Sequence, residues 1–367
     1  MLVLEAFLDP MSDNSQFYAC IMAGGSGERF WPMSRASVPK HLLKLFSERT
    51  LLEETVRRIE GVVPKENIFV LTNEVQLAGS RAALEGLVSA EQIVAEPAKR
   101  DTAPAAALAT ALVRARAGDA ATLALLPADA FIADHETFRT QLGAAMIDAS
   151  TRDTLITVGV KPTYPSTGFG YLEVGPESGR HAGRFPIRKV TRFVEKPDLT
   201  TAERYLEDGI YLWNAGIFVW NVATFLKEAE HSARELAVFI REFPQSEWSD
   251  FLGQRFPLLH KTSVDYAIME KSQRVETLMA KFDWDDVGMW TAVPKHLPRD
   301  AAGNTVRGPV VTERAANNIA VSNGRMIALC GVKDLVVVET ADAILVCHRD
   351  AVQDIKKLTG KLPKELL

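Results

Sequence analysis

The stretch FYACIMAGGSGERFWPMSRASVPK, residues 17–40, decides the fold. It opens with an apolar run at 17–23, which predicts a buried strand, and leads directly into Gly24, Gly25 and Gly27. Glycines that follow a buried strand let the backbone approach a ligand and point several N–H groups toward it. The stretch therefore predicts a strand followed by a ligand-binding loop.

Basic side chains follow the glycines in the same loop. Arg29, Arg35 and Lys40 supply positive charge, and amide donors combined with these cations would form a cradle for a polyphosphate. The alternative interpretation is a tight turn with solvated basic residues. Two better-known motifs fail, because the dinucleotide-binding GxGxxG needs Gly or Ala where Phe30 stands, and the P-loop needs a Gly-Lys pair that is absent. A dehydrogenase is therefore disfavoured.

Strand and helix patterns alternate beyond this loop. Apolar runs predict strands at 68–72, 92–95, 122–126 and 154–160, with helical patterns between them near 50–60, 74–88, 103–117 and 135–150. Strands that are apolar throughout are typical of a mostly parallel sheet covered by helices on both faces. Ligands bind such sheets at the carboxyl ends of the strands, where we expect the functional site.

The pattern of apolar and turn residues changes twice in the remaining chain. Residues 161–290 mix short strands, such as 211–221, with helical patterns near 200–208 and 222–240, whereas five short β-rich runs separated by turn residues follow residue 298. A last helix is expected at 351–359. We expect an N-terminal tail at 1–15, an α/β domain with the ligand-binding site at 16–297 and a C-terminal β-rich domain with a terminal helix at 298–367.

Composition narrows the class of protein. The 367 residues are 47% hydrophobic and carry a net charge of −5, which disfavours non-specific nucleic-acid binding. Three cysteines without CxxC spacing exclude a disulfide framework and a zinc ribbon. No apolar run reaches the ~18 residues of a membrane span, and the first residues lack the basic start of a signal peptide. We expect a cytoplasmic protein without nucleic-acid or membrane partners.

The loop at 24–40 resembles the N-terminal signature of sugar-1-phosphate nucleotidyltransferases, and its Trp-Pro-x-Ser-Arg continuation is similar to the mannose-1-phosphate guanylyltransferase branch. Further matches follow in the same order: EP at 96–97 with Arg100 and TAP at 102–104, LPAD at 126–129, TGFGY at 167–171, FVEKP at 193–197, WNAGIF at 213–218, SVDY at 263–266 and DVGMW at 286–290. Each tripeptide is weak evidence, but the ordered series is strong.

The resemblance implies a fold and an activity. The fold would be a Rossmann-like nucleotidyltransferase domain with a mixed, mostly parallel sheet, followed by a small domain like a left-handed β-helix. The activity would be Mg²⁺-dependent direct in-line transfer between GTP and mannose 1-phosphate, giving GDP-mannose and pyrophosphate. It also implies metal ligation by Asp129 and Asp286, contact of Lys196 with the sugar phosphate, and stabilisation of the leaving pyrophosphate by Arg29 and Lys40.

Binding residues are implied in the same way. They are Gly24, Gly25, Gly27, Glu96 and Arg100 for the nucleotide, and Gly168, Glu195, Asn214 and Asp265 for the sugar. From the residues alone, Asp129 fits a turn or helix cap, Asp286 an acidic turn beside Asp285, and Lys196 an exposed side chain. Three positions depart from the family pattern, since Ala130 stands for His, His41 for Gln and Asp101 for Asn.

Two alternatives keep the fold but change the function. One is a catalytically silent regulatory subunit that binds a nucleotide sugar, and the other is an enzyme for a different base or sugar, such as a thymidylyl- or uridylyltransferase. The charged residues Arg29, Lys40, Asp129, Lys196 and Asp286 favour an active enzyme. We expect a homodimer and, because the chain ends at Leu367, no isomerase domain.

Overall fold

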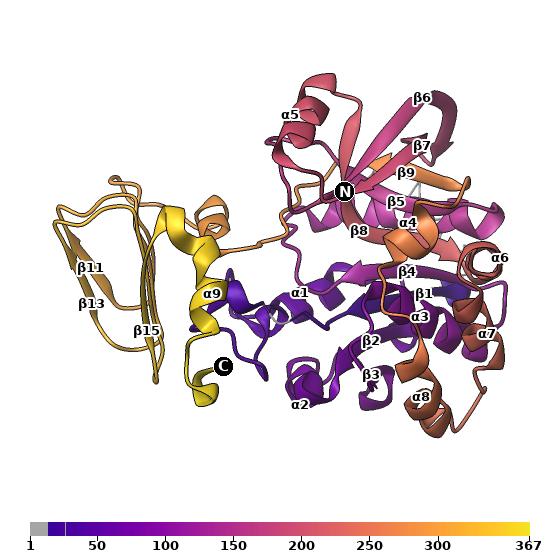
Figure 1. Ribbon diagram of the computed structural model, residues 1–367, viewed down its shortest axis with the longest axis horizontal. Helices are drawn as coiled ribbons and strands as arrows, with labels where there is room; N and C mark the ends of the chain where they lie inside the picture. The colour runs from indigo at the N-terminus through magenta and orange to yellow at the C-terminus, as the bar shows by residue number, and fades with distance from the viewer. Residues whose placement is uncertain (1–13, 26) are drawn as a thin grey trace.

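The computed structural model describes residues 14–25 and 27–367, so most of the predicted tail at 1–15 lies outside the described residues. A nine-stranded sheet in the order β3-β2-β1-β4-β8-β5-β9-β7-β6 forms the body of the molecule (Figure 1). Its strands are β1 (Phe17–Met22), β2 (Ile68–Asn73), β3 (Ile93–Glu96), β4 (Thr122–Pro127), β5 (Leu155–Val160), β6 (Gly170–Ala182), β7 (Phe185–Glu195), β8 (Tyr211–Asn221) and β9 (Val275–Met279). Five of these strands lie within two residues of the predicted apolar runs.

The sheet is mixed, as predicted. β3, β2, β1 and β4 are parallel neighbours, and β5 is parallel to β9. Antiparallel pairing enters through β8, which lies between β4 and β5, and through the β6–β7 hairpin. The carboxyl ends of the parallel strands consequently open on one edge, where the first loop emerges.

Helices cover both faces of the sheet, because its strands are apolar on both sides. In β1, Tyr18 and Cys20 face one core while Ala19 and Ile21 face the other. The first core includes α3, α6 and α7, and the second includes α1 and α4. The helices are α1 (Leu51–Arg58), α2 (Glu74–Ala83), α3 (Thr102–Ala117), α4 (His135–Thr151), α5 (Leu199–Asp208), α6 (Val222–Ser232), α7 (Arg234–Glu242), α8 (Ser249–Arg255) and α9 (Ile355–Thr359).

Side-chain caps place several helix starts. Thr50 accepts a hydrogen bond from the Glu53 N–H before α1, and Asn73 accepts one from the Gln76 N–H before α2. The predicted helix at 222–240 is divided in two, because Ala233 adopts φ −149° and ψ 62° between α6 and α7. Within the described residues, no helix is both long and apolar enough to cross a lipid bilayer.

The C-terminal part is a small stack of short strands. Parallel pairs join β10 to β12, β12 to β14 and β11 to β13, and β15 closes the larger sheet antiparallel to β14. Residues 305–313 form two short strands, since Gly308 turns the chain at φ 83° where a Cβ would overlap the Ser322 carbonyl oxygen. Its strands are β10 (Thr305–Arg307), β11 (Val310–Glu313), β12 (Ile319–Ser322), β13 (Ile327–Cys330), β14 (Leu335–Glu339) and β15 (Ile344–His348).

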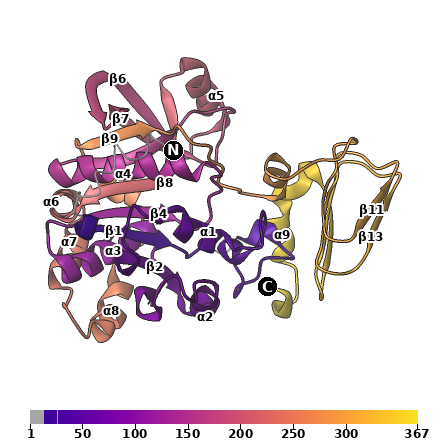
Figure 2. The same cartoon turned by 180° about the vertical axis from the view of Figure 1, so that it is seen from behind.

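One apolar core joins this C-terminal part to the first loop. Phe30 and Trp31 of the loop are buried together with Trp290, Val336 of β14 and Ile355 of α9. The Trp31 indole Nε1 also donates to the Leu366 carbonyl oxygen at 2.9 Å. Figures 1 and 2 both show α9 between the large domain and the β-rich part, beside the first loop. The C-terminal part therefore supports the loop that the sequence marks for ligand binding.

Candidate active site

Two distant carboxylates meet at the edge of the sheet. Asp129 follows β4 directly, and Asp286 is brought beside it by a two-residue bridge between the flanking segments. Phe131 donates its N–H to the Asp285 carbonyl oxygen at 2.8 Å, and Asp285 donates its N–H to the Phe131 carbonyl oxygen at 3.0 Å. Both aspartates line a pocket of about 290 Å³ with residues of the first loop.

Lys40 joins the two aspartates. Its buried ammonium lies 2.8 Å from Asp129 Oδ2 and also donates to the backbone carbonyl oxygen of Asp286. Gly27 lets this lysine approach the glycine loop, because a Cβ at Gly27 would overlap Lys40 Cβ and lie 2.7 Å from Lys40 N. With φ at 62°, Gly27 also has a conformation that favours glycine. The glycine loop and the acidic pair thus form a single unit.

The acidic pair has the chemistry of a divalent-cation site. Burial raises the pKa of Asp286 to about 6, and the nearby Asp285 and Asp129 carboxylates add to the increase against the opposing charge of Lys40. A cation bound between Asp129 and Asp286 would offset both the burial of the charged carboxylate and the repulsion between the carboxylates, and Mg²⁺ prefers carboxylate oxygens. The described residues contain no group of three or more candidate ligands, so remaining ligands would come from substrate or water.

Asp285, the acidic neighbour of Asp286, has a different role. Its carboxylate accepts hydrogen bonds from the Val287 N–H at 2.8 Å and from Lys295 Nζ at 3.1 Å, and it lies 3.1 Å from His296 Nε2. Burial opposes ionisation, but these partners lower the pKa of Asp285 to about 2. Asp285 therefore braces the segment that carries Asp286. Sequence reasoning did not find this brace, because its side-chain partners, Lys295 and His296, lie ten and eleven residues further along the chain.

Arg29 and Arg35 point to different places. Arg29 is exposed and lines the pocket with the two aspartates. Arg35 instead turns toward the C-terminal part, where its guanidinium lies 2.9 Å from Asp342 Oδ1 and over the Trp31 ring. The expectation that Arg35 adds charge to the cradle is therefore wrong, since its charge is used in docking the β-rich part.

The predicted sugar-binding residues form a second cluster. Lys196 pairs with Glu195, and Asn214 Nδ2 donates to Asp265 Oδ1 at 3.1 Å. Thr157 Oγ1 on β5 donates to Asn214 Oδ1 at 2.9 Å, which fixes the amide with its oxygen toward the strand. Strands β7 and β8 and the turn of helix at Asp265–Met269 thus bring together side chains that lie far apart in sequence.

Charges within this cluster influence one another. Burial, followed by the charge of Glu195, raises the pKa of Asp265 to about 7. Burial alone would lower the pKa of Lys196, but the hydrogen bond and charge of Glu195 raise it overall. Lys196 thus has a protonated ammonium beside acidic groups, which suits contact with a phosphate.

Gly170 and Gly168 differ in their surroundings. A Cβ at Gly170 would overlap Glu195 Oε2 and lie 3.2 Å from the Phe193 ring. A Cβ at Gly168 would meet only Ser166 Oγ, at 3.7 Å. The predicted backbone approach at Gly168 has no steric requirement within the chain, whereas Gly170 makes room for the Glu195 carboxylate.

Aromatic side chains lie between the two clusters. The Trp213 ring contacts Tyr164 and Phe169 with centroids 4.8 and 5.0 Å away, and Phe169 contacts Trp284 at 5.5 Å. Phe169 accepts the Lys196 N–H through its carbonyl oxygen at 3.2 Å. After burial, the carboxylates of Asp286 and Asp285 are the main causes that raise the pKa of Tyr164 to about 12. The aromatic group therefore connects the lysine end of the site to the acidic end.

The two residues predicted to contact the base have different surroundings. Glu96 ends β3, and burial together with the charge of Asp101 raises its pKa to about 8. The Arg100 guanidinium donates to the Pro257 carbonyl oxygen. Glu96 thus lies at the ligand-binding edge, while Arg100 is engaged with the segment after α8.

The three departures from the family pattern have distinct surroundings. His41 is buried, which lowers its pKa to about 4. Ala130 is buried and its carbonyl oxygen accepts from Arg58 at 3.2 Å. Asp101 has φ 70° and caps α3 through the Thr102 N–H. Aspartate, like asparagine, carries a side-chain oxygen that can accept this N–H, so the substitution keeps the cap.

Two family models cover most of the chain. Residues 18–301 match the model of the nucleotidyl transferases. Residues 308–362 match that of the mannose-phosphate isomerase and GMP-like β-helix domain. The first match includes both side-chain clusters, and the second includes α9.

Characterised proteins resemble the chain over nearly its whole length. The xanthan biosynthesis protein XanB of Xanthomonas campestris is 36% identical over 351 residues, which are 93% of this chain and 72% of that protein. A mannose-1-phosphate guanylyltransferase of Escherichia coli K12 is 34% identical over 95% of this chain and 74% of its own length. The crystal structure of a Thermus thermophilus protein, described as a mannose-1-phosphate geranyltransferase, superposes with a TM-score of 0.85 at 32% identity, covering 94% of this chain and 99% of that one.

Proposed function

Because this chain belongs to the mannose-1-phosphate guanylyltransferase family of nucleotidyltransferases, we propose that it makes GDP-mannose and pyrophosphate from GTP and mannose 1-phosphate. A phosphate oxygen of mannose 1-phosphate attacks the α-phosphorus of GTP. The new P–O bond forms as the bond between the α-phosphorus and the bridging oxygen to the β-phosphate breaks, and pyrophosphate leaves with that electron pair. The attacking oxygen is already ionised, so the step needs no general base.

The protein must bring two polyanions together and offset their repulsion. Lys196 holds the sugar phosphate, while Glu195, Asn214 and Asp265 bind sugar hydroxyls. The N–H groups of Gly24, Gly25 and Gly27 face the triphosphate. Asp129 and Asp286 would hold Mg²⁺, which when bound supplies positive charge to the phosphates.

Two further residues act on the leaving group. Arg29 stabilises pyrophosphate as its charge develops, and Lys40 keeps the two aspartates in register while adding positive charge beneath them. Glu96, at the end of the edge strand β3, contacts the guanine base. Arg100 supports that edge through its bond to Pro257.

A single observation carries this proposal. Lys40 bonds to both Asp129 and the Asp286 backbone at one end of the sheet edge, while Lys196 is held by Glu195 at the other. This arrangement offers a cation-binding pair of carboxylates for a nucleoside triphosphate at one end and a lysine ammonium for a sugar phosphate at the other. A regulatory subunit would not need to keep both ends charged.

The test is pyrophosphate release with Mg²⁺, using GTP, ATP, UTP and dTTP against mannose 1-phosphate and glucose 1-phosphate. We expect release to require GTP and mannose 1-phosphate together and to be lost in Asp129→Ala. Asp283→Ala is the matched control, because Asp283 caps the Ala133 and Asp134 N–H groups and does not line the pocket. Release with a different pair would show that the enzyme uses another nucleotide or sugar phosphate. Binding of GDP-mannose without turnover of any pair would favour the regulatory subunit.

We also propose a homodimer in the cytoplasm. Ile344 and Val346 of β15 are 57% and 64% exposed, which is unusual for apolar side chains that share one face of an edge strand. A second copy covering them would remove this apolar surface from water. Light scattering after size exclusion would give one chain mass if the proposal is wrong.

A further inference from the structure

We propose that Lys356, on α9 of the C-terminal β-rich part, binds the phosphates of the nucleoside triphosphate at the active site. The inference rests on the proposed function and deepens it, since it gives the β-rich part a direct contact with substrate. The family match of the C-terminal part by itself assigns no such contact.

The pocket at Asp129 and Asp286 draws one side chain from a distant part of the chain. Among the described residues that line it, the basic ones are Arg29, Lys40 and Lys356. The Lys40 ammonium is engaged with Asp129 and with the Asp286 carbonyl oxygen. Arg29 and Lys356 are therefore the cations that remain to face an incoming polyphosphate.

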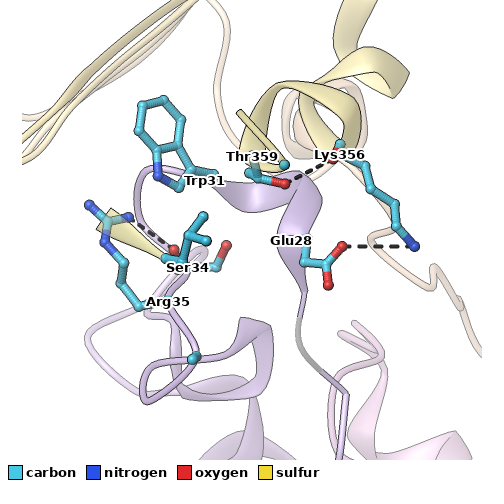
Figure 3. Close-up of a pocket in the computed structure, with 9 residues that line it drawn as sticks. Glu28, Trp31, Ser34, Arg35, Lys356 and Thr359 are labelled. Carbon is cyan, nitrogen blue, oxygen red and sulfur yellow. Dashed lines mark hydrogen bonds and ion pairs between the residues drawn. The ribbon is translucent and has the colours of Figure 1, made fainter. Parts of the chain in front are cut away.

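The backbone of α9 is held firmly where Lys356 leaves it. Ile355, the preceding residue, is 2% exposed and lies in the core shared with Phe30 and Trp31. Thr359 is also buried, and its Oγ1 donates to the Lys356 carbonyl oxygen at 2.9 Å. Figure 3 shows the Lys356 side chain extending from α9 toward Glu28 in the first loop. An anchored backbone with a largely exposed side chain is the arrangement of a ligand-binding lysine.

The present partner of Lys356 is a weak competitor. Its Nζ lies 3.8 Å from Glu28 Oε2, beyond hydrogen-bond distance, and the two side chains are 64% and 45% exposed. An exposed pair of this kind contributes little to stability. A triphosphate offers more negative charge and more acceptor oxygens than one carboxylate. Lys356 can thus exchange Glu28 for phosphate at small cost.

Glu28 and Lys356 also form a boundary. Both line the pocket at the aspartates and a second cavity of about 320 Å³ between the first loop and α9 (Figure 3). Lys356 consequently stands at the junction of the catalytic loop and the β-rich part. A phosphate bound there would contact Arg29 of the first loop and Lys356 of the β-rich part at the same time, and would thus link the two parts.

The experiment compares two adjacent lysines. Lys356→Ala removes the proposed contact, and Lys357→Ala removes an equal charge from a side chain that is 82% exposed, pairs with Asp354 at 2.7 Å and does not line the pocket. Dissociation constants for GTP with Mg²⁺ are measured by calorimetry, and KM for pyrophosphate is measured in the reverse reaction. We expect Lys356→Ala to weaken both by about 10–100-fold, the scale of one charged hydrogen bond.

The other variants define the outcome. Lys357→Ala should stay within about twofold of the natural chain, Lys356→Arg should recover most of the affinity, and KM for mannose 1-phosphate should not change. Lys356→Met keeps the aliphatic stem and replaces the alanine variant if that variant is unstable. Natural affinity for GTP in Lys356→Ala, or equal losses in the two alanine variants, would overturn the proposal.

Binding and turnover separate this inference from the proposed function. If the natural chain binds GTP, Lys356→Ala binds it weakly and no sugar phosphate gives turnover, then Lys356 stands and the proposed function fails. If turnover is normal in the natural chain and Lys356→Ala keeps the natural dissociation constant for GTP and the natural KM for pyrophosphate, the proposed function stands and the lysine contact fails. If the natural chain binds none of GTP, ATP, UTP and dTTP, both fail.

Discussion

Arg29 and Arg35 carry the same charge in the same loop, and only Arg29 faces the pocket. We expect Arg29→Ala to lower kcat by a factor on the order of 10²–10³, because it removes a preorganised donor from the leaving pyrophosphate. Arg35→Ala is the matched control and should lower Tm while leaving kcat within a few fold, since it breaks the pair with Asp342. Steady-state kinetics and thermal unfolding of both variants check this, and unchanged kcat in Arg29→Ala would remove it from the mechanism.

Glu96 makes a prediction about stability against pH. Its pKa is raised from 4.5 to about 8, first by burial and then by the charge of Asp101. Between these values the native chain holds a proton that the unfolded chain has released, so the free energy of unfolding falls as pH rises. Glu96→Gln stays neutral and should be more stable than the natural chain at pH 8, by on the order of 1–3 kcal/mol, with little difference near pH 4.5.

The measurement for Glu96 is denaturant unfolding at both pH values without nucleotide or metal. Glu66→Gln serves as control, because it makes the same change at an exposed position before β2. A pH-independent difference between Glu96→Gln and the natural chain would show that packing, rather than ionisation, separates them.

At the scale of elements, the first loop depends on one glycine more than on its neighbours. Gly27→Ala requires φ 62° from an alanine and an overlap with Lys40 Cβ, whereas a Cβ at Gly25 has nothing within 4 Å. We expect Gly27→Ala to lower Tm by several degrees and kcat at least tenfold, since Lys40 must move from the aspartates. Gly25→Ala should keep its Tm, and equal thermal shifts in the two variants would contradict the argument.

The start of β6 offers a second matched pair. Gly170→Ala displaces the Glu195 carboxylate, the end of a flexible side chain, so the fold should survive while KM for mannose 1-phosphate rises about tenfold. Gly168→Ala places its Cβ at an ordinary distance from Ser166 and should leave KM unchanged. Kinetics with both substrates varied decide this. A rise in KM for GTP alone would assign Gly170 to the wrong end of the site.

Elements were predictable from the sequence where their apolar pattern is local. The strands β1 to β5 are continuous apolar runs bounded by turn residues, so their positions can be predicted from the local sequence pattern. Pairing in the sheet did not follow in the same way, because β8 lies between β4 and β5 although it comes later in the chain. The convergence of Asp129 and Asp286 has the same origin. It depends on the bridge between Phe131 and Asp285, for which no short-range signal exists.

At the scale of the whole molecule, the loop signature has two roles that the sequence does not separate. Gly27 and Arg29 line the pocket, whereas Phe30 and Trp31 are buried in the core shared with the β-rich part. The sequence also does not distinguish Lys356 from Lys357, which are adjacent and both exposed. Only the position of α9 in the structure shows that they have different partners. The direction in which each of these side chains points depends on how distant parts of the chain pack together. That packing is set by the apolar core that contains Phe30, Trp290, Val336 and Ile355.

That shared core makes a last prediction, which uses two adjacent valines on β14. Val336 is fully buried in the core with Phe30, Trp31 and Trp290, whereas Val337 points to the opposite face, into the separate core of the β-rich part. Val336→Ala should cost on the order of 2 kcal/mol of stability and also lower kcat/KM for GTP several-fold, because the cavity lies under the first loop. Val337→Ala should lose comparable stability and keep its kinetics at a temperature well below unfolding. If the β-rich part only stabilised the fold, both variants would lose stability and both would keep their kcat/KM for GTP. That result would contradict a role of the shared core in positioning the first loop.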